Sequence, residues 1–94
     1  MHLIADICVI PLGVGLSVSE YVAACERVFE DAGLERQLHA YGTNVEGELD
    51  TILRAVQTVH ETLHAEGAPR LVTSIKLGTR IDKEPSLAAK LFKT

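Results

Sequence analysis

Hydrophobic and polar side chains alternate along four short stretches of the chain, and such a period of two is typical of β-strands with one buried face. The first stretch is rich in β-branched residues, and Pro11 and two nearby glycines follow it, which we expect to end the strand. Gly42 interrupts the pattern after the second stretch, so a tight connection is expected there. The alternation therefore predicts strands at residues 3–10, 34–41, 43–46 and 71–77.

Apolar side chains recur every three or four residues in two longer stretches, as they do in helices that bury one face. The first covers residues 18–32, where Ser17 opens a sequence with capping-box spacing and Gly33 supplies the left-handed residue that commonly ends a helix. The second stretch begins at Leu49 and ends at Gly67. Two helices are therefore predicted, one after the first strand and one after the third.

The order of these elements predicts the fold class. It reads βαββαβ, followed by a short C-terminal helix that Ser86 would cap. Right-handed crossovers turn this order into an α+β sandwich of the ferredoxin-like type, a four-stranded antiparallel sheet with both helices on one face. The other face would carry Asp6, Cys8, Gln37, His39, Tyr41, Asn44, Glu46, Ser74 and Lys76, mixed with Ile4, Ile10 and Val72. This surface is too apolar to be left exposed to solvent and too polar to form a core, so we expect a partner subunit or a ligand to cover it.

Length and composition narrow the class of protein. Ninety-four residues, with 47% hydrophobic and 23% charged side chains, indicate a single globular domain over residues 1–94. No apolar run approaches the ~20 residues needed to span a bilayer, and the N-terminal stretch lacks the basic segment and cleavage site of an export signal. Cys8 and Cys25 have no disulfide or metal-site spacing, so we expect reduced thiols and a cytoplasmic location.

Charge is unevenly distributed along the chain. The formal net charge of −4 argues against nucleic acid as the main partner, and only one aromatic side chain is expected on the open sheet face, where RNA-binding sheets need platforms. Residues 70–94 are nevertheless locally basic. A solvated tail, pairing with acidic helices of another subunit, and anion binding are all compatible with that segment.

Residues 60–64 match the zinc-binding pattern HExxH, which places two imidazoles one helical turn apart. The apolar stripe of the second helix puts His60 on the side that faces the sheet, whereas a catalytic zinc ion needs an open cleft. We therefore interpret the match as a coincidence, expect a packed and hydrogen-bonded His60, and predict no metal. A zinc hydrolase stays as a minor alternative.

Two glycine-containing segments are candidates for ligand contact. Residues 13–19 open a helix, so their amides could hold an anion, but a strand-to-helix turn capped by Ser17 explains the same residues. Residues 41–47 bring hydroxyl, amide and carboxylate groups between two glycines, which would let a ligand approach the backbone closely. Hairpin geometry alone, with Glu46 capping the second helix, is the alternative.

Three blocks resemble the small thiamine-binding-protein family in their order and separation: IPLGVGLSVSEYVA at residues 10–23, YGTNVEG at 41–47 and TSIKLGTRIDK at 73–83. The resemblance implies a ferredoxin-like domain that assembles as dimers or tetramers and binds thiamine or its hydroxymethylpyrimidine half, with no established catalysis. Ala40 and Tyr41 stand where the family usually has Pro and Met. The positions that the resemblance indicates are Ser17, Ser19, Thr43, Glu46, Ser74 and Lys76.

The expected function is therefore binding of thiamine or a related pyrimidine by a cytoplasmic homodimer or homotetramer, without catalysis or a cofactor. An aminopyrimidine offers adjacent donor and acceptor atoms that carboxylate, hydroxyl and amide groups can pair, and its ring can stack on an aromatic side chain. The expected ligand-binding residues are Ser17, Ser19, Tyr41, Thr43, Asn44, Glu46, Ser74 and Lys76. The alternative is a regulatory or scaffolding module that oligomerises without a small-molecule ligand.

Overall fold

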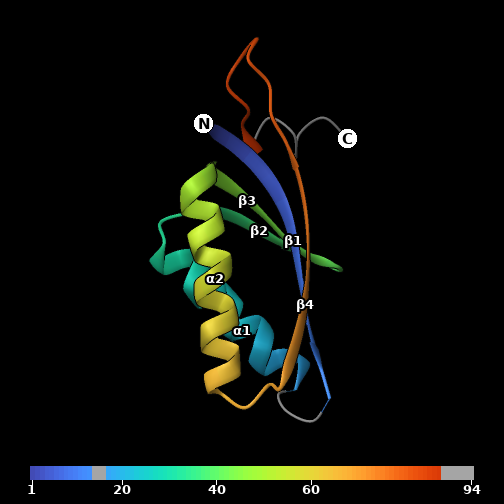
Figure 1. Ribbon diagram of the computed structural model, residues 1–94. Coiled ribbons are helices and arrows are strands. Elements are labelled where there is room, and N and C mark those ends of the chain that lie inside the picture. The colour runs from blue at the N-terminus through green and yellow to red at the C-terminus, as the bar shows by residue number, and fades with distance from the viewer. Residues whose placement is uncertain (14–16, 88–94) are drawn as a thin grey trace.

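Four antiparallel strands form one sheet in the order β2-β3-β1-β4, with both helices on the same face (Figure 1). The computed structural model describes residues 1–13 and 17–87. Its elements are β1 (His2–Leu12), α1 (Val18–Asp31), β2 (Glu35–His39), β3 (Gly42–Glu48), α2 (Leu49–Ala65) and β4 (Arg70–Gly78). The predicted ferredoxin-like fold is confirmed, whereas the predicted C-terminal helix falls mostly on residues 88–94, outside the described part of the chain.

The core lies between the sheet and the helices. On the central strand β1, the alternate side chains of Leu3, Ala5 and Ile7 are at most 2% exposed and face the helices. Phe29 of α1 and Ile52 of α2 pack in the same cluster and are equally buried. Complete burial of an aliphatic or aromatic side chain contributes roughly 1.5–3 kcal/mol, so this layer supplies most of the stability that holds the site in place.

Strand β1 is longer than the sequence indicates, because it does not end at Pro11. Pro11 and Leu12 still pair with β4, opposite Leu71 and Arg70. Proline has no N–H to donate, and it is tolerated where a strand lacks a neighbour on one side. The pairing of β1 with β3 reaches only Ile7, so the proline lies where β1 has a single neighbour.

The helix boundaries follow the predicted signals. Ser17 caps α1 through a capping box with Glu20, and the backbone turns at Gly33 with φ +75° directly after the cap of that helix. Gly67, with φ +109°, follows α2 in the same way. Leu53 of α2 is 48% exposed, so it lies outside the buried face that Ile52 and Val59 form on that helix.

Close packing accounts for both glycines of β3, more strictly for Gly42, which meets the backbone, than for Gly47, which meets the end of a side chain, so neither is by itself evidence of a ligand. A Cβ atom at Gly42 would lie 2.5 Å from the carbonyl oxygen of Ile7, and one at Gly47 would lie 2.5 Å from Leu34 Cδ2. These distances are far below van der Waals contact. The geometric alternative for the glycines of residues 41–47 is therefore sufficient.

The face of the sheet opposite the helices is only partly open. After β4 the chain turns back toward the N-terminal end of β1 (Figure 1), and Leu87 is 6% exposed there. The prediction of a bare face therefore needs correction, because the chain itself covers one end of it. Neither of the two described helices combines the length and apolar character that crossing a membrane requires.

Candidate functional site

A cleft of about 320 Å³ lies between α1 and the β2–β3 hairpin, on the helix side of the sheet. We call it the hairpin cleft. Its walls are mainly apolar and come from β1, α1 and β2; the main apolar contributors are Ile7, Val9, Val22, Phe29 and Leu38. A concave, mostly apolar surface with a few polar groups is typical of sites that bind small molecules.

The polar groups of the hairpin cleft centre on Glu26, which α1 places at the edge of its buried face. The Thr43 hydroxyl donates to Glu26 Oε2 at 2.9 Å, and Arg36 Nε donates to Glu26 Oε1 at 3.1 Å. Thr43 is 4% exposed and is the one polar residue that is buried among the residues that the structure describes. A carboxylate has about four acceptor positions, so Glu26 keeps capacity for a ligand donor after these two bonds.

The hairpin turn closes one end of the cleft and is fixed to β1 through His39. The backbone N–H of Tyr41 donates to His39 Nδ1 at 3.2 Å, so this nitrogen is an acceptor. The ring proton then lies on Nε2, which donates to Asp6 Oδ1 at 2.6 Å. Because both ring nitrogens have partners, His39 fixes the orientation of the hairpin turn relative to β1.

Cys25 is one of two cysteines that line the cleft, and its thiol is unreactive. Burial raises the pKa of Cys25 to about 11, and the neighbouring charge of Glu26 acts in the same direction. At neutral pH the side chain is therefore a protonated thiol, whereas nucleophilic attack requires the thiolate. Cys25 adds a small apolar surface and a weak donor to the cleft.

A second hollow, of about 430 Å³, lies on the open face of the sheet. Asp6, Asn44 and Lys76 from the three adjacent strands β1, β3 and β4 line it, together with Pro85 from the returning chain. Within the described residues no carboxylate lies in ion-pair distance of Lys76. The carboxylate of Asp6 is bonded to His39 instead.

Glu46, one row further along the same face, attaches the returning chain. Its Oε1 accepts the backbone N–H of Leu87 at 2.6 Å, and its Oε2 lies 2.9 Å from His2 Nε2. The hydrogen bond from Leu87, followed by that from His2, lowers the pKa of Glu46. The hydrogen bond to Glu46 in turn raises the pKa of His2. We call these three residues the Glu46 clasp.

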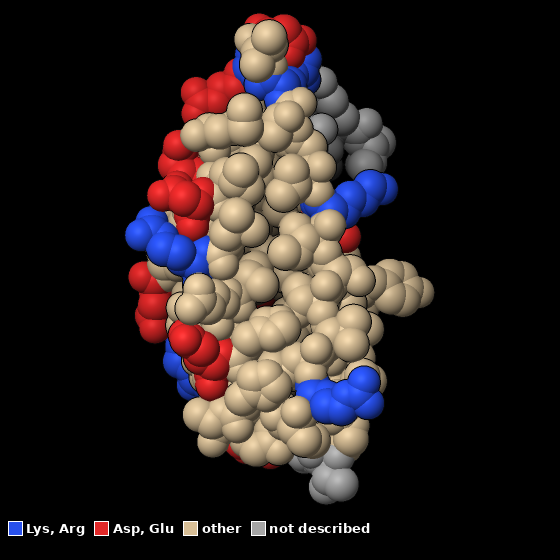
Figure 2. Space-filling model, in the orientation of Figure 1, with Lys and Arg blue, Asp and Glu red and all other residues tan. Residues whose placement is uncertain are grey.

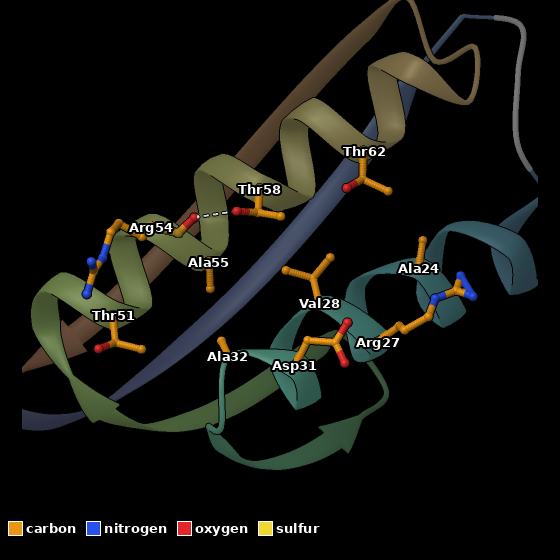
Figure 3. Close-up of a pocket in the computed structure, with 10 residues that line it drawn as sticks. All are labelled: Ala24, Arg27, Val28, Asp31, Ala32, Thr51, Arg54, Ala55, Thr58 and Thr62. Carbon is orange, nitrogen blue, oxygen red and sulfur yellow. Dashed lines mark hydrogen bonds between the residues drawn. The ribbon is translucent and has the colours of Figure 1, made fainter.

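A third hollow, of about 590 Å³, runs between α1 and α2 (Figure 3). Small side chains such as Ala24, Ala32 and Ala55 line it. The hydroxyl of Thr58 is already bonded to the Arg54 carbonyl one turn earlier, at 3.0 Å. The charged residues of this groove, Arg27, Asp31 and Arg54, are exposed, whereas Glu26 in the hairpin cleft is partly buried.

The predicted ligand residues do not form one site. Tyr41 and Thr43 line the hairpin cleft, while Asn44 lies on the open face because successive strand residues point to opposite sides. Tyr41 was expected on the open sheet face; it lies instead in the hairpin turn, 84% exposed. The remaining predicted residues lie elsewhere: Ser17 and Ser19 bond each other at the start of α1, Ser74 and Lys76 are exposed on β4, and Glu46 belongs to the clasp.

The sequence analysis did not identify Glu26 and Arg36, although both carried a signal. Glu26 lies between Val22 and Phe29 at helical spacing, so it is an acidic residue at the border of an apolar stripe. Arg36 takes an inward position in the alternation of β2. Opposite charges at two half-buried positions are expected to meet, which is what brings Arg36 to Glu26.

The HExxH residues have structural roles. His60 Nε2 lies 2.6 Å from the Thr73 hydroxyl on β4, and His64 Nδ1 donates to the Ala68 carbonyl at 2.8 Å. The prediction that His60 faces the sheet and is hydrogen-bonded is confirmed. Among the residues that the structure describes, no three His, Cys, Asp or Glu side chains gather in a way that could hold a metal ion.

The chain is a small ferredoxin-like protein, and its hairpin cleft has the shape and lining that are typical of a small-molecule site. Comparison with known families is more specific: the chain belongs to the thiamine-binding protein family, whose model matches residues 5–94. The family resemblance drawn from the sequence is therefore confirmed.

Several relatives carry names that describe no activity. The chain is 50% identical over 91 residues to the UPF0045 protein sll0230 of Synechocystis, a match that covers 97% of this chain and 75% of that protein. It is 36% identical to the UPF0045 protein ECM15 of the fungus Eremothecium gossypii, over 97% of this chain and 88% of the relative.

The solved structures confirm the fold. The hypothetical protein MJ1052 of Methanocaldococcus jannaschii superposes with a TM-score of 0.87 at 40% identity, over 97% of this chain and 93% of that one. A Thermotoga maritima protein, provisionally assigned to thiamine biosynthesis or salvage, has a TM-score of 0.83 at 19% identity and covers 99% of this chain and 98% of its own. At that identity the likeness concerns the fold alone.

Proposed function

We propose that this protein is a cytoplasmic homo-oligomer that binds thiamine or a related pyrimidine, such as hydroxymethylpyrimidine, in the hairpin cleft without transforming it. The observation that carries this proposal is the pair of Glu26 and Thr43, a carboxylate and a hydroxyl 2.9 Å apart inside an apolar cleft. Membership of the thiamine-binding protein family supports the class of ligand.

The chemistry of an aminopyrimidine suits these groups. Its exocyclic amine donates hydrogen bonds, which Glu26 can accept at its free lone pairs. Its ring nitrogens accept hydrogen bonds, and the Thr43 hydroxyl can rotate from Glu26 to donate to one of them. The flat apolar ring would lie against the apolar walls of the cleft, including Phe29.

The charged half of thiamine would lie toward the mouth of the cleft. A thiazolium cation is attracted to the face of an aromatic ring, and Tyr41 lines the cleft at the exposed hairpin turn. The net charge of −4 favours approach of a cation over approach of an anion. In this arrangement the pyrimidine provides the specific contacts, and the thiazolium contributes less because its contacts face solvent.

Titration calorimetry with thiamine and with hydroxymethylpyrimidine tests the ligand. We expect saturable binding of at least one of them by the wild type, and a loss of about tenfold or more in affinity for Glu26→Gln, which keeps the shape and removes the charge. Arg36→Gln is the matched control, because it breaks the same ion pair but leaves the carboxylate, and it should bind within about threefold of the wild type. Absence of binding of both ligands to folded wild-type protein would refute the proposal.

Two further measurements test the remaining parts of the proposal. Mass spectrometry of the ligand after prolonged incubation with the protein should recover it unchanged; any stoichiometric or catalytic product would contradict a purely binding role. Light scattering during gel filtration should give a mass at least twice the 10.2 kDa of one chain. An oligomer that binds neither thiamine nor hydroxymethylpyrimidine would instead favour the scaffolding alternative.

A further inference from the structure

The imidazole ring of His39 connects the hollow on the open face of the sheet with the hairpin cleft. Its Nε2 donates to Asp6 Oδ1 at 2.6 Å, and Asp6 lines the hollow on the open face. Its Nδ1 accepts the backbone N–H of Tyr41 at 3.2 Å, and both His39 and Tyr41 line the hairpin cleft. One continuous chain of hydrogen bonds therefore runs from the open face to the mouth of the cleft.

The register of the sheet explains how His39 reaches Asp6 across the strand between them. His39 on β2 is paired with Gly42 on β3, and Asp6 on β1 is paired with Asn44 on the same strand. The two side chains thus start two strands and one row apart. Gly42 has no side chain to stand between them, so the imidazole can lie across β3.

Asp6 is turned toward His39 although a lysine lies opposite it on β4. Lys76 is the cross-strand partner of Asp6, but among the residues that the structure describes Asp6 has His39 alone within ion-pair distance. Figure 2 shows that most of the acidic side chains visible from this side lie along the flank of α2, on the helix face of the sheet. Asp6 is therefore the charge that acts most directly on the ring. The other titratable or charged groups that line the two hollows are Cys8, Cys25, Glu26, Tyr41 and Arg80.

Only one protonation state of His39 makes both contacts. The neutral ring with its proton on Nε2 donates to Asp6 and accepts from Tyr41. When Nδ1 takes up a proton, the imidazolium has two N–H donors, and its Nδ1–H then faces the N–H of Tyr41. The contact with the carboxylate becomes an ion pair and is kept, whereas the contact with the turn is lost. The ring is 32% exposed, so solvent protons reach it, and imidazoles commonly change charge between about pH 5 and 8.

We propose that His39 is a positioning residue whose protonation releases the hairpin turn, so that the protein holds thiamine less tightly at mildly acidic pH. This inference rests on the proposed function and adds the regulation of the same site. Two effects act in the same direction: the turn that carries Tyr41 loses a fixed contact, and the imidazolium charge repels the thiazolium cation. Hydroxymethylpyrimidine has no thiazolium, so its affinity should change little.

Nitrogen-15 NMR of the imidazole tests the switch without any ligand. At about pH 8 we expect the proton of His39 on Nε2 and none on Nδ1. Titration toward about pH 5 should protonate Nδ1 and shift the amide resonance of Tyr41 with the same midpoint. Asp6→Asn removes the carboxylate that favours the imidazolium, so the midpoint should move to a lower pH. A neutral ring with its proton on Nδ1, or a Tyr41 amide that does not respond when the ring titrates, would overturn the proposal.

Calorimetric titration at about pH 8 and about pH 5.5 tests the effect on the ligand. In the wild type we expect thiamine affinity to fall about three- to tenfold at the lower pH, the size of one lost hydrogen bond. Hydroxymethylpyrimidine affinity should change less than about twofold. His64→Gln is the control: it removes a histidine that is bonded to the Ala68 carbonyl after α2, and it should keep the full pH dependence. An equal pH dependence for both ligands would contradict the role given to the turn.

Two variants of His39 separate its two contacts. His39→Gln places an amide nitrogen near the position of Nε2, so it keeps a donor for Asp6 and loses the acceptor for Tyr41. His39→Asn places an amide oxygen near the position of Nδ1, so it keeps the acceptor for the turn. Neither variant should show the pH dependence, and His39→Asn should bind thiamine more tightly than His39→Gln.

The reverse order of the two variants would overturn the proposal. A wild type that binds neither thiamine nor hydroxymethylpyrimidine would instead refute the proposed function, whereas the NMR titration still decides whether protonation of His39 releases the turn. Failure of the switch and failure of the ligand hypothesis therefore give different results.

Discussion

Strand β3 carries polar residues on both faces of the sheet, and these residues have different roles on the two faces. On the helix side, Thr43 joins Glu26 in an apolar cleft where the carboxylate keeps free acceptor positions. On the open face, Glu46 is bonded to Leu87 and His2, both from the same chain. Glu46, the carboxylate that the sequence analysis singled out, thus has structural partners, whereas Glu26, which it did not identify, is placed to contact a ligand.

The largest expected effect is a difference in the free energy of unfolding lost by mutations on the two faces of the sheet. Phe29→Ala removes a side chain that is 1% exposed and forms part of the cleft wall, so we expect the free energy of unfolding to fall by about 3–5 kcal/mol. Ile4→Ala, at a half-buried position on the open face, should cost about 1 kcal/mol. Chemical denaturation measures both. Equal losses would mean that the two sides of the sheet are packed alike and that the helix side is not the core.

A moderate effect is expected in the reactivity of the two thiols. Cys8 is half-buried on the open face, and Cys25 is buried in the cleft with its pKa raised to about 11. Iodoacetamide at neutral pH should therefore alkylate Cys8 well before Cys25, because the thiolate is the reacting species. Peptide mass spectrometry over time distinguishes the sites. Faster reaction at Cys25 would show that the cleft is wetter or more open than described.

A smaller effect concerns the pH dependence of the Glu46 clasp. His2 has a raised pKa, so its contribution is complete below its ordinary value of about 6.5 and is lost as the pH rises through the raised value. Glu46 has a lowered pKa, so its contribution is complete above about 4.5 and is lost as the pH falls through the lowered value. Attachment of residues 85–87 should therefore be strongest between these limits.

Hydrogen exchange of the Leu87 amide, followed by NMR across that range, measures the clasp. We expect protection to decline on both sides of the window in the wild type. Glu46→Gln should weaken protection and remove the decline on the acid side, and His2→Gln should remove the decline on the basic side. Protection that does not change with pH in the wild type would contradict the assignment of these hydrogen bonds.

The fold was predictable because its signals are local and periodic. The alternation along residues 3–10 predicts a strand, and the apolar stripe between Ser17 and Gly33 predicts the helix α1. The order of such elements along the chain is compatible with a single packing arrangement. The extension of β1 through Pro11 was not predictable, because it depends on where β3 stops pairing. The attachment of Leu87 to Glu46 was equally hidden, since it joins residues 41 positions apart.

The site was less predictable than the fold for a physical reason. Thr43 was identified, but it was grouped with its neighbour Asn44, although adjacent residues of a strand cannot face the same ligand from one side. The partner of Thr43 is Glu26, 17 positions earlier on a helix, and only the packing of α1 on the sheet brings the two together. Spacing along the chain indicates a hairpin; it does not indicate which helix residue lies above it.

The most direct test of the account compares Thr43 with Asn44, two adjacent residues on opposite faces of β3. Calorimetric titration with hydroxymethylpyrimidine and thiamine should show that Thr43→Val, which removes the hydroxyl and keeps the shape, weakens binding about tenfold or more. Asn44→Ala should bind within about twofold of the wild type. The reverse result, with binding lost in Asn44→Ala and kept in Thr43→Val, would place the ligand on the open face and contradict the hairpin cleft as its site.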